Sequence, residues 1–221
     1  MSPDITLYTY TLAPYVQGIH AFLEESGFEL EIIEVDVKMN KPAWFEALSP
    51  TGNVPLLKVG ERLLFESSVI LEYLDEISGG RFQPKDILKK AHHRSWKVFG
   101  DMLLNDLLHV MVAPSDQELE EKQAVFHRHC AVLEKELGEG PWFDGKDVSL
   151  VDFSYAALFT RYDFLVRVFG FAKLDAFPKV AAWSRQILER SSMTASVPEN
   201  FEQVNIGWLH SCHSAIAKRG A

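Results

Sequence analysis

The chain has 221 residues, enough for one large domain or for two small domains that each bury a core of their own. Hydrophobic residues make up 47% of the sequence, a share typical of soluble globular proteins. The formal charge of -9 and the lack of a Lys/Arg cluster argue against nucleic acid or an anionic membrane as a partner, because both require a positive face.

The sequence pattern shows neither a membrane segment nor a cysteine framework. No apolar run approaches the ~20 residues that a membrane helix requires, and the polar start Met1–Asp4 has no signal-peptide core. Cys130 and Cys212, the only cysteines, lie far apart, so no disulfide framework or cysteine-rich zinc site is expected. We therefore predict a cytoplasmic protein that uses no metal.

The beginning of the chain predicts a strand, a helix and a second strand. Ile5–Thr9 is a short β-prone run, and apolar residues then recur at helical spacing from Val16 until Gly27. Leu30–Val37 returns to an alternating β pattern. These elements form a βαβ unit, for which a right-handed crossover is expected.

A second group of elements follows. Pro42 opens a short helix, and two strands, Leu56–Val59 and Arg62–Phe65, then flank a two-residue Gly-X hairpin turn. A further helix starts at Glu66 and ends at Gly79, where paired glycines give a strong stop signal.

In the remainder of the chain the β signal disappears. One long helix is predicted over Ile87–Val112 and a second over residues 115–138. A third begins at Ser149, which with Asp152 three positions later approximates a capping box, and a fourth follows Pro178.

This change in pattern predicts two domains. We place the first at residues 1–80 and the second at residues 87–221, joined by a linker at 81–86. The first is α/β, with a βαβ unit followed by a ββα unit, and the second is all α.

Two short motifs indicate a binding site for a peptide. In Gly-Asn-Val-Pro at residues 52–55, the proline precedes an apolar strand, and a prolyl bond in such a tight turn is where a cis peptide occurs. This turn exposes the N–H and C=O of Val54 to an extended ligand. Glu-Ser-Ser at 66–68 opens a helix, whose free N–H groups bind a carboxylate while Glu66 binds an ammonium.

With three further motifs, these residues resemble the cytosolic glutathione transferases, nearest to omega-like, lambda-like and bacterial-type members. The resemblance covers nearly the whole chain, and it implies a thioredoxin-like N-terminal domain followed by an all-helical C-terminal domain. The five motifs are Leu-Ala-Pro-Tyr-Val-Gln at 12–17, Asn-Lys-Pro-Ala-Trp-Phe at 40–45, Gly-Asn-Val-Pro at 52–55, Glu-Ser at 66–67 with Leu-Glu-Tyr-Leu-Asp-Glu at 71–76, and Ser-Leu-Val-Asp at 149–152.

The resemblance also implies a site for glutathione, the co-substrate of this family. Lys41 would pair with the glycyl carboxylate, and Val54 would pair through its backbone with the cysteinyl part. Glu66 and Ser67 would hold the γ-glutamyl end, and Pro55 would be cis. The predicted glutathione-binding residues are Lys41, Asn53, Val54, Pro55, Glu66 and Ser67.

The chain departs from the family pattern where chemistry takes place. The omega-like pattern has a cysteine before the Pro-Tyr or Pro-Phe pair, and other classes have a serine, but this chain has Ala13. A thiol is favoured there because a helix N-terminus stabilises a thiolate. Alanine is a poor N-cap, worse than Ser or Asp by about 1 kcal/mol, and it leaves the amides of Tyr15 and Val16 without a side-chain partner.

Three functions therefore remain open. In the first, a glutathione transferase, the helix amides stabilise the thiolate for attack on a hydrophobic electrophile or for ether cleavage. In the second, Ala13 replaces the cysteine of a glutathione-dependent thiol reductase or lyase in an engineered chain. The third is a non-catalytic glutathione-binding or protein-interaction module, which the intact glutathione-binding residues disfavour. In the first function a neighbouring hydroxyl could assist: Tyr8, Thr9, Tyr10, Thr11 or Tyr15.

The electrophile would bind in the mouth between the domains, where the helices that start at Ile87 and Ser149 face the thiol. The residues there suggest an apolar, aromatic molecule with anionic character near Arg161. Family members are usually two-fold dimers, and we expect a homodimer. The candidate residues for this substrate are Leu12, Leu107, Leu108, Met111, Arg161, Tyr162 and Leu165.

Overall fold

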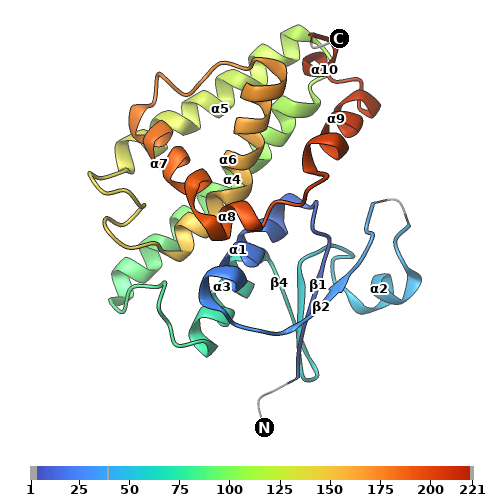
Figure 1. The fold of residues 1–221 in the computed structure, drawn as a ribbon, viewed down its shortest axis with the longest axis vertical. Helices are drawn as coiled ribbons and strands as arrows, with labels where there is room; N and C mark the ends of the chain where they lie inside the picture. The colour runs from blue at the N-terminus through green and yellow to red at the C-terminus, as the bar shows by residue number, and fades with distance from the viewer. Residues whose placement is uncertain (1–3, 39, 220–221) are drawn as a thin grey trace.

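The computed structural model describes residues 4–38 and 40–219, and it shows a sheet-bearing N-terminal part with a helical C-terminal part stacked above it (Figure 1). This arrangement confirms the predicted fold class, a thioredoxin-like domain followed by an all-helical domain. The exact domain bounds stay a prediction. None of the helices in the described ranges is both long and apolar enough to cross a membrane.

The sheet has four strands in the order β2-β1-β3-β4. Strand β1 (Ile5–Thr9) pairs in parallel with β2 (Glu31–Glu34) and antiparallel with β3 (Leu56–Val59), which pairs antiparallel with β4 (Arg62–Phe65). Strands β1, β3 and β4 have the predicted bounds. The second strand is shorter than predicted: it ends at Glu34, and the last backbone bond to β1 is donated by the N–H of Val35 to the carbonyl oxygen of Thr9 at 2.7 Å.

The alternation of side chains along the strands divides the N-terminal part into two layers. Leu7 and Leu57 join a core that contains α1 (Gln17–Ser26) and α3 (Ser67–Ile77), whereas Tyr8 and Leu56 face the opposite side of the sheet. That side is covered by α2 (Ala43–Leu48), and the small cluster there includes Ala13 and Val54. Ala13 and Val54 therefore lie on the α2 side of the sheet.

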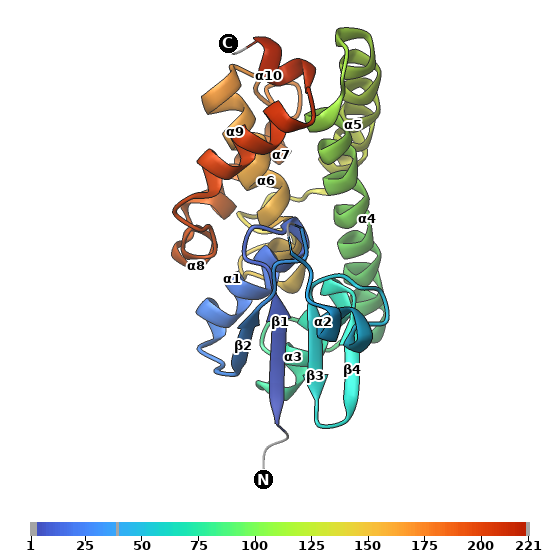
Figure 2. The same ribbon diagram turned by 90° about the vertical axis from the view of Figure 1, so that its right-hand side faces the viewer.

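A long helix, α4, reaches from the helical part down beside the sheet-bearing part (Figure 2). Among the described residues, the C-terminal part consists of α4 (Ile87–Val112), α5 (Asp116–Glu136), α6 (Leu150–Phe169), α7 (Pro178–Glu189), α8 (Ser191–Ala195), α9 (Phe201–Ser211) and α10 (Ala215–Arg219).

The two parts share one core. Helix α1 packs against α6, and the approach is so close that a β-carbon on Gly18 would lie 2.5 Å from the carbonyl oxygen of Phe153. Glycine is required there because a larger residue would push the helices apart. The contact fixes the start of α1, and hence Ala13, relative to the helical part.

Candidate functional site

A cavity of about 640 Å³, which we call the sheet-end cavity, lies where η1 (Pro14–Val16), the loop before β3, the start of α3 and the middle of α4 meet. It brings together residues from motifs that are far apart in sequence. Those predicted to bind glutathione or to act in catalysis, and which line the cavity, are Ala13, Tyr15, Asn53, Val54, Pro55, Glu66 and Ser67.

Lys41 lies at the margin of this cavity. Its Nζ is 3.4 Å from the position that a β-carbon on Gly52 would take, so the ammonium lies over the loop that contributes Thr51 and Asn53 to the cavity. A different lysine, Lys38, lines the cavity directly. Sequence reasoning did not select Lys38, because it lies outside every motif.

The peptide bond between Val54 and Pro55 is cis, as the resemblance implies. Ser49 Oγ donates a hydrogen bond of 3.2 Å to the carbonyl oxygen of Asn53, which holds the turn. Within the described residues, neither the N–H nor the C=O of Val54 has a hydrogen-bond partner. Val54 therefore presents one donor and one acceptor that an extended ligand can satisfy.

Glu66 has an unusual backbone conformation at the edge of the cavity. Its φ is 71°, a region that L-residues rarely adopt, and its carbonyl oxygen accepts hydrogen bonds from the N–H groups of Val69 and Ile70. The next two residues, Ser67 and Ser68, start α3 with N–H groups that have no partner in the described part of the chain. Such strained positions cluster at functional sites, and free N–H groups at a helix start bind carboxylates.

Asp101 contributes a second carboxylate that sequence reasoning missed. It comes from α4 and lines the same cavity as Glu66, near enough for their charges to interact. Burial, the charge of Glu66 and the opposing effect of Lys97 together raise the pKa of Asp101 to about 6, and burial is the largest of the three. A pair of carboxylates that repel each other across a cavity favours a cationic group between them.

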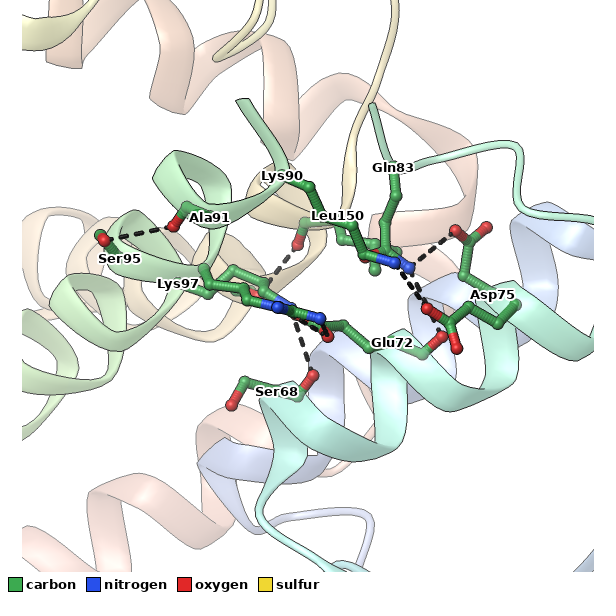
Figure 3. Close-up of polar contacts among 12 residues, drawn as sticks. Ser68, Glu72, Asp75, Gln83, Lys90, Ala91, Ser95, Lys97 and Leu150 are labelled. Carbon is green, nitrogen blue, oxygen red and sulfur yellow. Dashed lines mark hydrogen bonds and ion pairs between the residues drawn. The ribbon is translucent and has the colours of Figure 1, made fainter. Parts of the chain in front are cut away.

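A polar network joins α4 to α3 (Figure 3). The buried Nζ of Lys97 donates to the carbonyl oxygen of Ser68 at 3.2 Å and to Glu72 Oε1 at 2.6 Å. Arg94 pairs with the same Glu72 carboxylate, at 3.0 Å. Lys97 lies one helical turn before Asp101, so this clamp holds the carboxylate over the N-terminus of α3.

Ala13 precedes a short 3-10 turn rather than the first turn of an α-helix. It is 8% exposed and extended, with φ -71° and ψ 135°. The N–H of Val16 donates to the carbonyl oxygen of Ala13 at 3.4 Å, because a 3-10 turn closes after three residues. No side chain caps this turn, as expected for alanine; the N–H of Val16 has this backbone partner, and the N–H of Tyr15 has none within the described residues.

Two of the five hydroxyls proposed to assist, those of Thr9 and Thr11, are engaged elsewhere. Thr9 is fully buried and bonds to His20 Nε2 at 2.9 Å, and Thr11 Oγ1 donates to Glu34 at 2.9 Å. Tyr8 packs on the aromatic rings of α2. Tyr15 lines the sheet-end cavity, and burial raises the pKa of its hydroxyl, as do the charges of Asp101 and Glu66, so it stays a proton donor.

A second cavity of about 540 Å³, the interdomain pocket, adjoins the first one. Pro14 and Lys38 line both. Of the residues predicted for the hydrophobic substrate, Leu12, Leu108 and Arg161 line this pocket.

The other four predicted substrate residues lie elsewhere. Leu107, Met111 and Leu165 are fully buried in the shared core, and Tyr162, 3% exposed, donates its hydroxyl hydrogen to the carbonyl oxygen of Ala172. Helical spacing identified the apolar residues of α4 and α6 correctly, but it could not tell which of them face the pocket. No group of three or more His, Cys, Asp or Glu side chains suited to a metal ion occurs among the residues described.

Two family models match the chain. Residues 13–77 match the N-terminal domain of glutathione S-transferases, and residues 116–186 match the C-terminal domain. The chain is 30% identical over 183 residues to glutathione S-transferase U27 of Arabidopsis thaliana, which covers 80% of this chain and 81% of that protein. It is 26% identical over 201 residues to glutathione S-transferase U19 of the same plant, with 90% and 92% covered.

Solved structures share the fold. Rice glutathione S-transferase GST1, in complex with glutathione, superposes with a TM-score of 0.80 at 23% identity over 100% of both chains. Glutathione transferase Omega 3C from Trametes versicolor gives a TM-score of 0.79 at 23% identity, covering 90% of this chain and 91% of that chain. A tau-class enzyme from mango gives 0.77 at 18% identity, with 91% and 96% covered. Because omega and tau structures are about equally similar, the omega-like and lambda-like assignment stays a prediction.

Proposed function

Because the chain belongs to the glutathione S-transferase superfamily and is a transferase of this kind, we propose that the sheet-end cavity holds glutathione and activates its thiol toward a hydrophobic electrophile. The observation that carries this proposal is the convergence of five separate segments on one cavity. They supply two carboxylates, the free N–H groups of a helix start, and the unpaired main chain of Val54.

Each part of glutathione has a matching group. The α-carboxylate of the γ-glutamyl residue would accept hydrogen bonds from Ser67, and its ammonium would lie between Glu66 and Asp101. The cysteinyl main chain would pair with Val54 as an added strand does. The glycyl carboxylate would lie toward Lys41, over the loop that ends at Asn53.

The thiol would then lie beside Ala13, at the start of the 3-10 turn. The N–H of Tyr15 and the positive end of α1 favour the thiolate, as they favour any anion there. In a substitution the sulfur forms a bond to the electrophilic carbon, the leaving group departs with the bonding electrons, and the thiol proton passes to solvent. Ala13 adds no hydrogen bond to this step.

Two further parts of the proposal concern the cellular compartment and the oligomeric state. We place the enzyme in the cytoplasm, and we assign it a two-fold dimer in which the exposed apolar side chains of β4, α3 and α4 meet their copies. The side chains that support this are Phe65 (40% exposed), Val69 (48%), Val98 (62%) and Met102 (41%).

Calorimetric titration of glutathione tests the proposed site. Glu66→Gln keeps the size of the side chain but removes the charge that faces the ammonium. We expect it to weaken glutathione binding about tenfold or more, as expected for loss of a hydrogen bond to a charged group. Glu61→Gln, at an exposed hairpin position, is the matched control. Equal affinity for the wild type and Glu66→Gln would show that the γ-glutamyl site is misplaced.

A further inference from the structure

The interdomain pocket has a charge opposite to that of the protein. The chain carries 31 acidic and 22 basic residues, yet the pocket is lined by Lys38, Arg161 and His109 and by no carboxylate among the described residues. The adjoining sheet-end cavity, in contrast, has Glu66 and Asp101 in its wall. One continuous site thus has an acidic end and a basic end.

Arg161 supplies a buried positive charge without a carboxylate partner. It is 3% exposed, and its guanidinium donates to the carbonyl oxygen of Leu12 at 3.1 Å, to Gln17 Oε1 at 3.2 Å and to the carbonyl oxygen of Ala157 at 3.3 Å. All three acceptors are neutral. No ion pair to Arg161 occurs within the described ranges, so its charge is left to act on the pocket.

Three of the five N–H donors of Arg161 are already bonded to neutral oxygens and the side chain is 3% exposed, so the exposed Lys38 is better placed than Arg161 to contact a ligand. Lys38 is exposed and lines the pocket, and its Nζ lies 5.0 Å from the ring centre of Trp208. Partial burial and the charge of Arg161 lower the pKa of Lys38, while Cys212 raises it. Two cations that repel each other at the pocket wall favour an anion beside Lys38.

The nearby carboxylates are engaged elsewhere. Glu34 accepts hydrogen bonds from the N–H of Thr11 at 2.7 Å and from the hydroxyl of the same residue at 2.9 Å. Asp36 accepts the backbone N–H of Lys38 at 3.1 Å. Neither lines the pocket.

The remaining walls carry some polar side chains, among them Asn105, Asn205 and Ser211, but their larger side chains are apolar and come from three segments. Leu12 lies before the 3-10 turn, Leu108 and Val112 lie on α4, and Val204 and Trp208 lie on α9. A flat apolar body fits between such walls, with its charged end at Lys38, which also lines the sheet-end cavity.

We propose that the electrophile of this enzyme is an aromatic or similarly apolar molecule that carries a carboxylate, and that Lys38 is the residue that recognises this carboxylate. The proposal rests on the proposed function, since it concerns the second substrate of the same reaction. Arg161 does not contact the carboxylate; its buried, fixed positive charge attracts the carboxylate electrostatically. The acidic end of the site binds the ammonium of glutathione, and the basic end selects an electrophile that carries a negative charge.

The test compares two electrophiles of nearly the same shape, 4-chloro-3-nitrobenzoate and its neutral amide, at saturating glutathione. With each, the thiolate sulfur bonds to the ring carbon and chloride leaves with the bonding electrons. The value of kcat/KM for each is divided by the rate constant of the uncatalysed reaction, which removes the difference in intrinsic reactivity. We expect the wild type to prefer the benzoate roughly tenfold, about 1.4 kcal/mol.

Substitutions at Lys38 then show whether this residue causes the preference for the benzoate over the amide. Lys38→Gln should bring the ratio close to one, Lys38→Arg should retain it, and Lys122→Gln, the same charge change on the exposed face of α5, should not alter it. If Lys38 serves glutathione instead, Lys38→Gln lowers both values equally and the ratio stays unchanged, which overturns the proposal. A wild-type ratio near one overturns it as well.

A binding measurement distinguishes a failure of the carboxylate recognition by Lys38 from a failure of the proposed glutathione site. Titrating unreactive 3-nitrobenzoate and 3-nitrobenzamide into the glutathione complex, followed by tryptophan fluorescence, should show the benzoate binding roughly tenfold more tightly. If glutathione binds but the two nitroarenes bind equally, only the recognition of the carboxylate is wrong. If glutathione itself does not bind, the proposed function fails.

Discussion

At the scale of single residues, the Asp101 carboxylate lowers the stability of the empty protein when it is ionised, and the same ionised form favours a bound ammonium. Its pKa is raised from 3.8 to about 6, mainly by burial, so the folded protein holds this proton more tightly than the unfolded chain does. The stability that this proton gives is fully present at low pH and is lost as the pH rises through about 4 to 6. Above that range the ionised carboxylate destabilises the empty site and suits a bound ammonium.

The first prediction follows for Asp101→Asn. At about pH 7.5 the variant should be more stable than the wild type by about 1–2 kcal/mol, and near pH 4 the two should be alike, as urea unfolding at both values would show. A variant that is less stable at both values would mean that Asp101 holds the structure together.

The second prediction concerns the binding of glutathione between Glu66 and Asp101. Because the ammonium prefers the ionised form of Asp101, the affinity of the wild type should rise as the pH rises through about 6 and then level off. In Asp101→Asn this rise should disappear. Calorimetry at three pH values across this range measures it, and an identical rise in both proteins would contradict the role given to Asp101.

Ala13 leads to the third prediction. Its extended backbone and its place before Pro14 suit a serine, which would add a hydroxyl beside the thiolate. Ala13→Ser should raise kcat/KM about tenfold with a chloronitrobenzene, since a hydrogen bond to a charged group contributes about 1.5–3 kcal/mol. Ala13→Gly, which adds no hydroxyl, should not. A lower rate in Ala13→Ser would mean that the thiol lies against residue 13 with no space for an oxygen.

The residues that the sequence failed to predict share one cause. Val54, Glu66 and Ser67 were predictable because each belongs to a local motif, whose turn or helix start already determines its chemistry. Lys38 and Asp101 belong to no motif, and they line the site because α4 and the loop after β2 fold against it. Such long-range packing has no local signature in the sequence.

At the scale of elements, the start of α6 shows a capping box whose acid is buried. Asp152 accepts hydrogen bonds from the N–H of Phe143 (2.9 Å), from the N–H and hydroxyl of Ser149 (2.7 and 2.8 Å) and from the indole of Trp183 (2.6 Å). Burial raises the pKa of Asp152, while these hydrogen bonds lower it. The sequence predicted the box from spacing alone. It did not predict the contacts to Phe143 and Trp183, which come from a loop and from α7.

The fourth prediction is therefore that Asp152→Ala destabilises the protein by about 3 kcal/mol or more, because it leaves several buried donors unsatisfied. Asp163→Ala, which removes an exposed ion pair with Arg167 on the same helix, should change the stability by about 1 kcal/mol or less. Urea unfolding of both variants decides it, and similar losses in the two would show that the buried hydrogen bonds contribute little.

Element bounds were predicted best where a strong signal ends the element. Helix α4 has its predicted bounds because Pro114 stops it, and α1 ends at Gly27, whose φ of 66° few other residues adopt. Helix α1 begins at Gln17, one residue after the predicted periodicity starts, because residues 14–16 form a 3-10 turn that nothing in the sequence distinguishes from an α-helical one.

At the scale of the whole molecule, the site depends on both parts of the chain. Asp101 and the walls of the interdomain pocket come from the helical part, whereas Val54 and Glu66 come from the sheet-bearing part. Exposed apolar side chains flank this junction on β4, α3 and α4. A second copy that covers them would lie close to the sheet-end cavity, because Phe65 contributes to both.

The fifth prediction concerns this apolar face. The wild type should run as a dimer in light scattering coupled to size exclusion, and the double variant Val69→Glu with Val98→Glu should run as a monomer, because charges placed in an apolar interface oppose its burial. Val132→Glu, on α5, is the control, because Val132 is a valine of comparable exposure (43%) away from this face. A monomeric wild type would rule out the proposed interface.

The central claim is that this enzyme activates the thiol of glutathione in the sheet-end cavity without a side-chain partner at residue 13. Its most direct test is a pH titration of the glutathione complex, followed by the ultraviolet absorbance of the thiolate, with Glu66→Gln as the binding-impaired reference. We predict that the pKa of the bound thiol lies about one unit or more below that of free thiols, which ionise near 8.5. A bound thiol that ionises at the same pH as free glutathione would contradict the account.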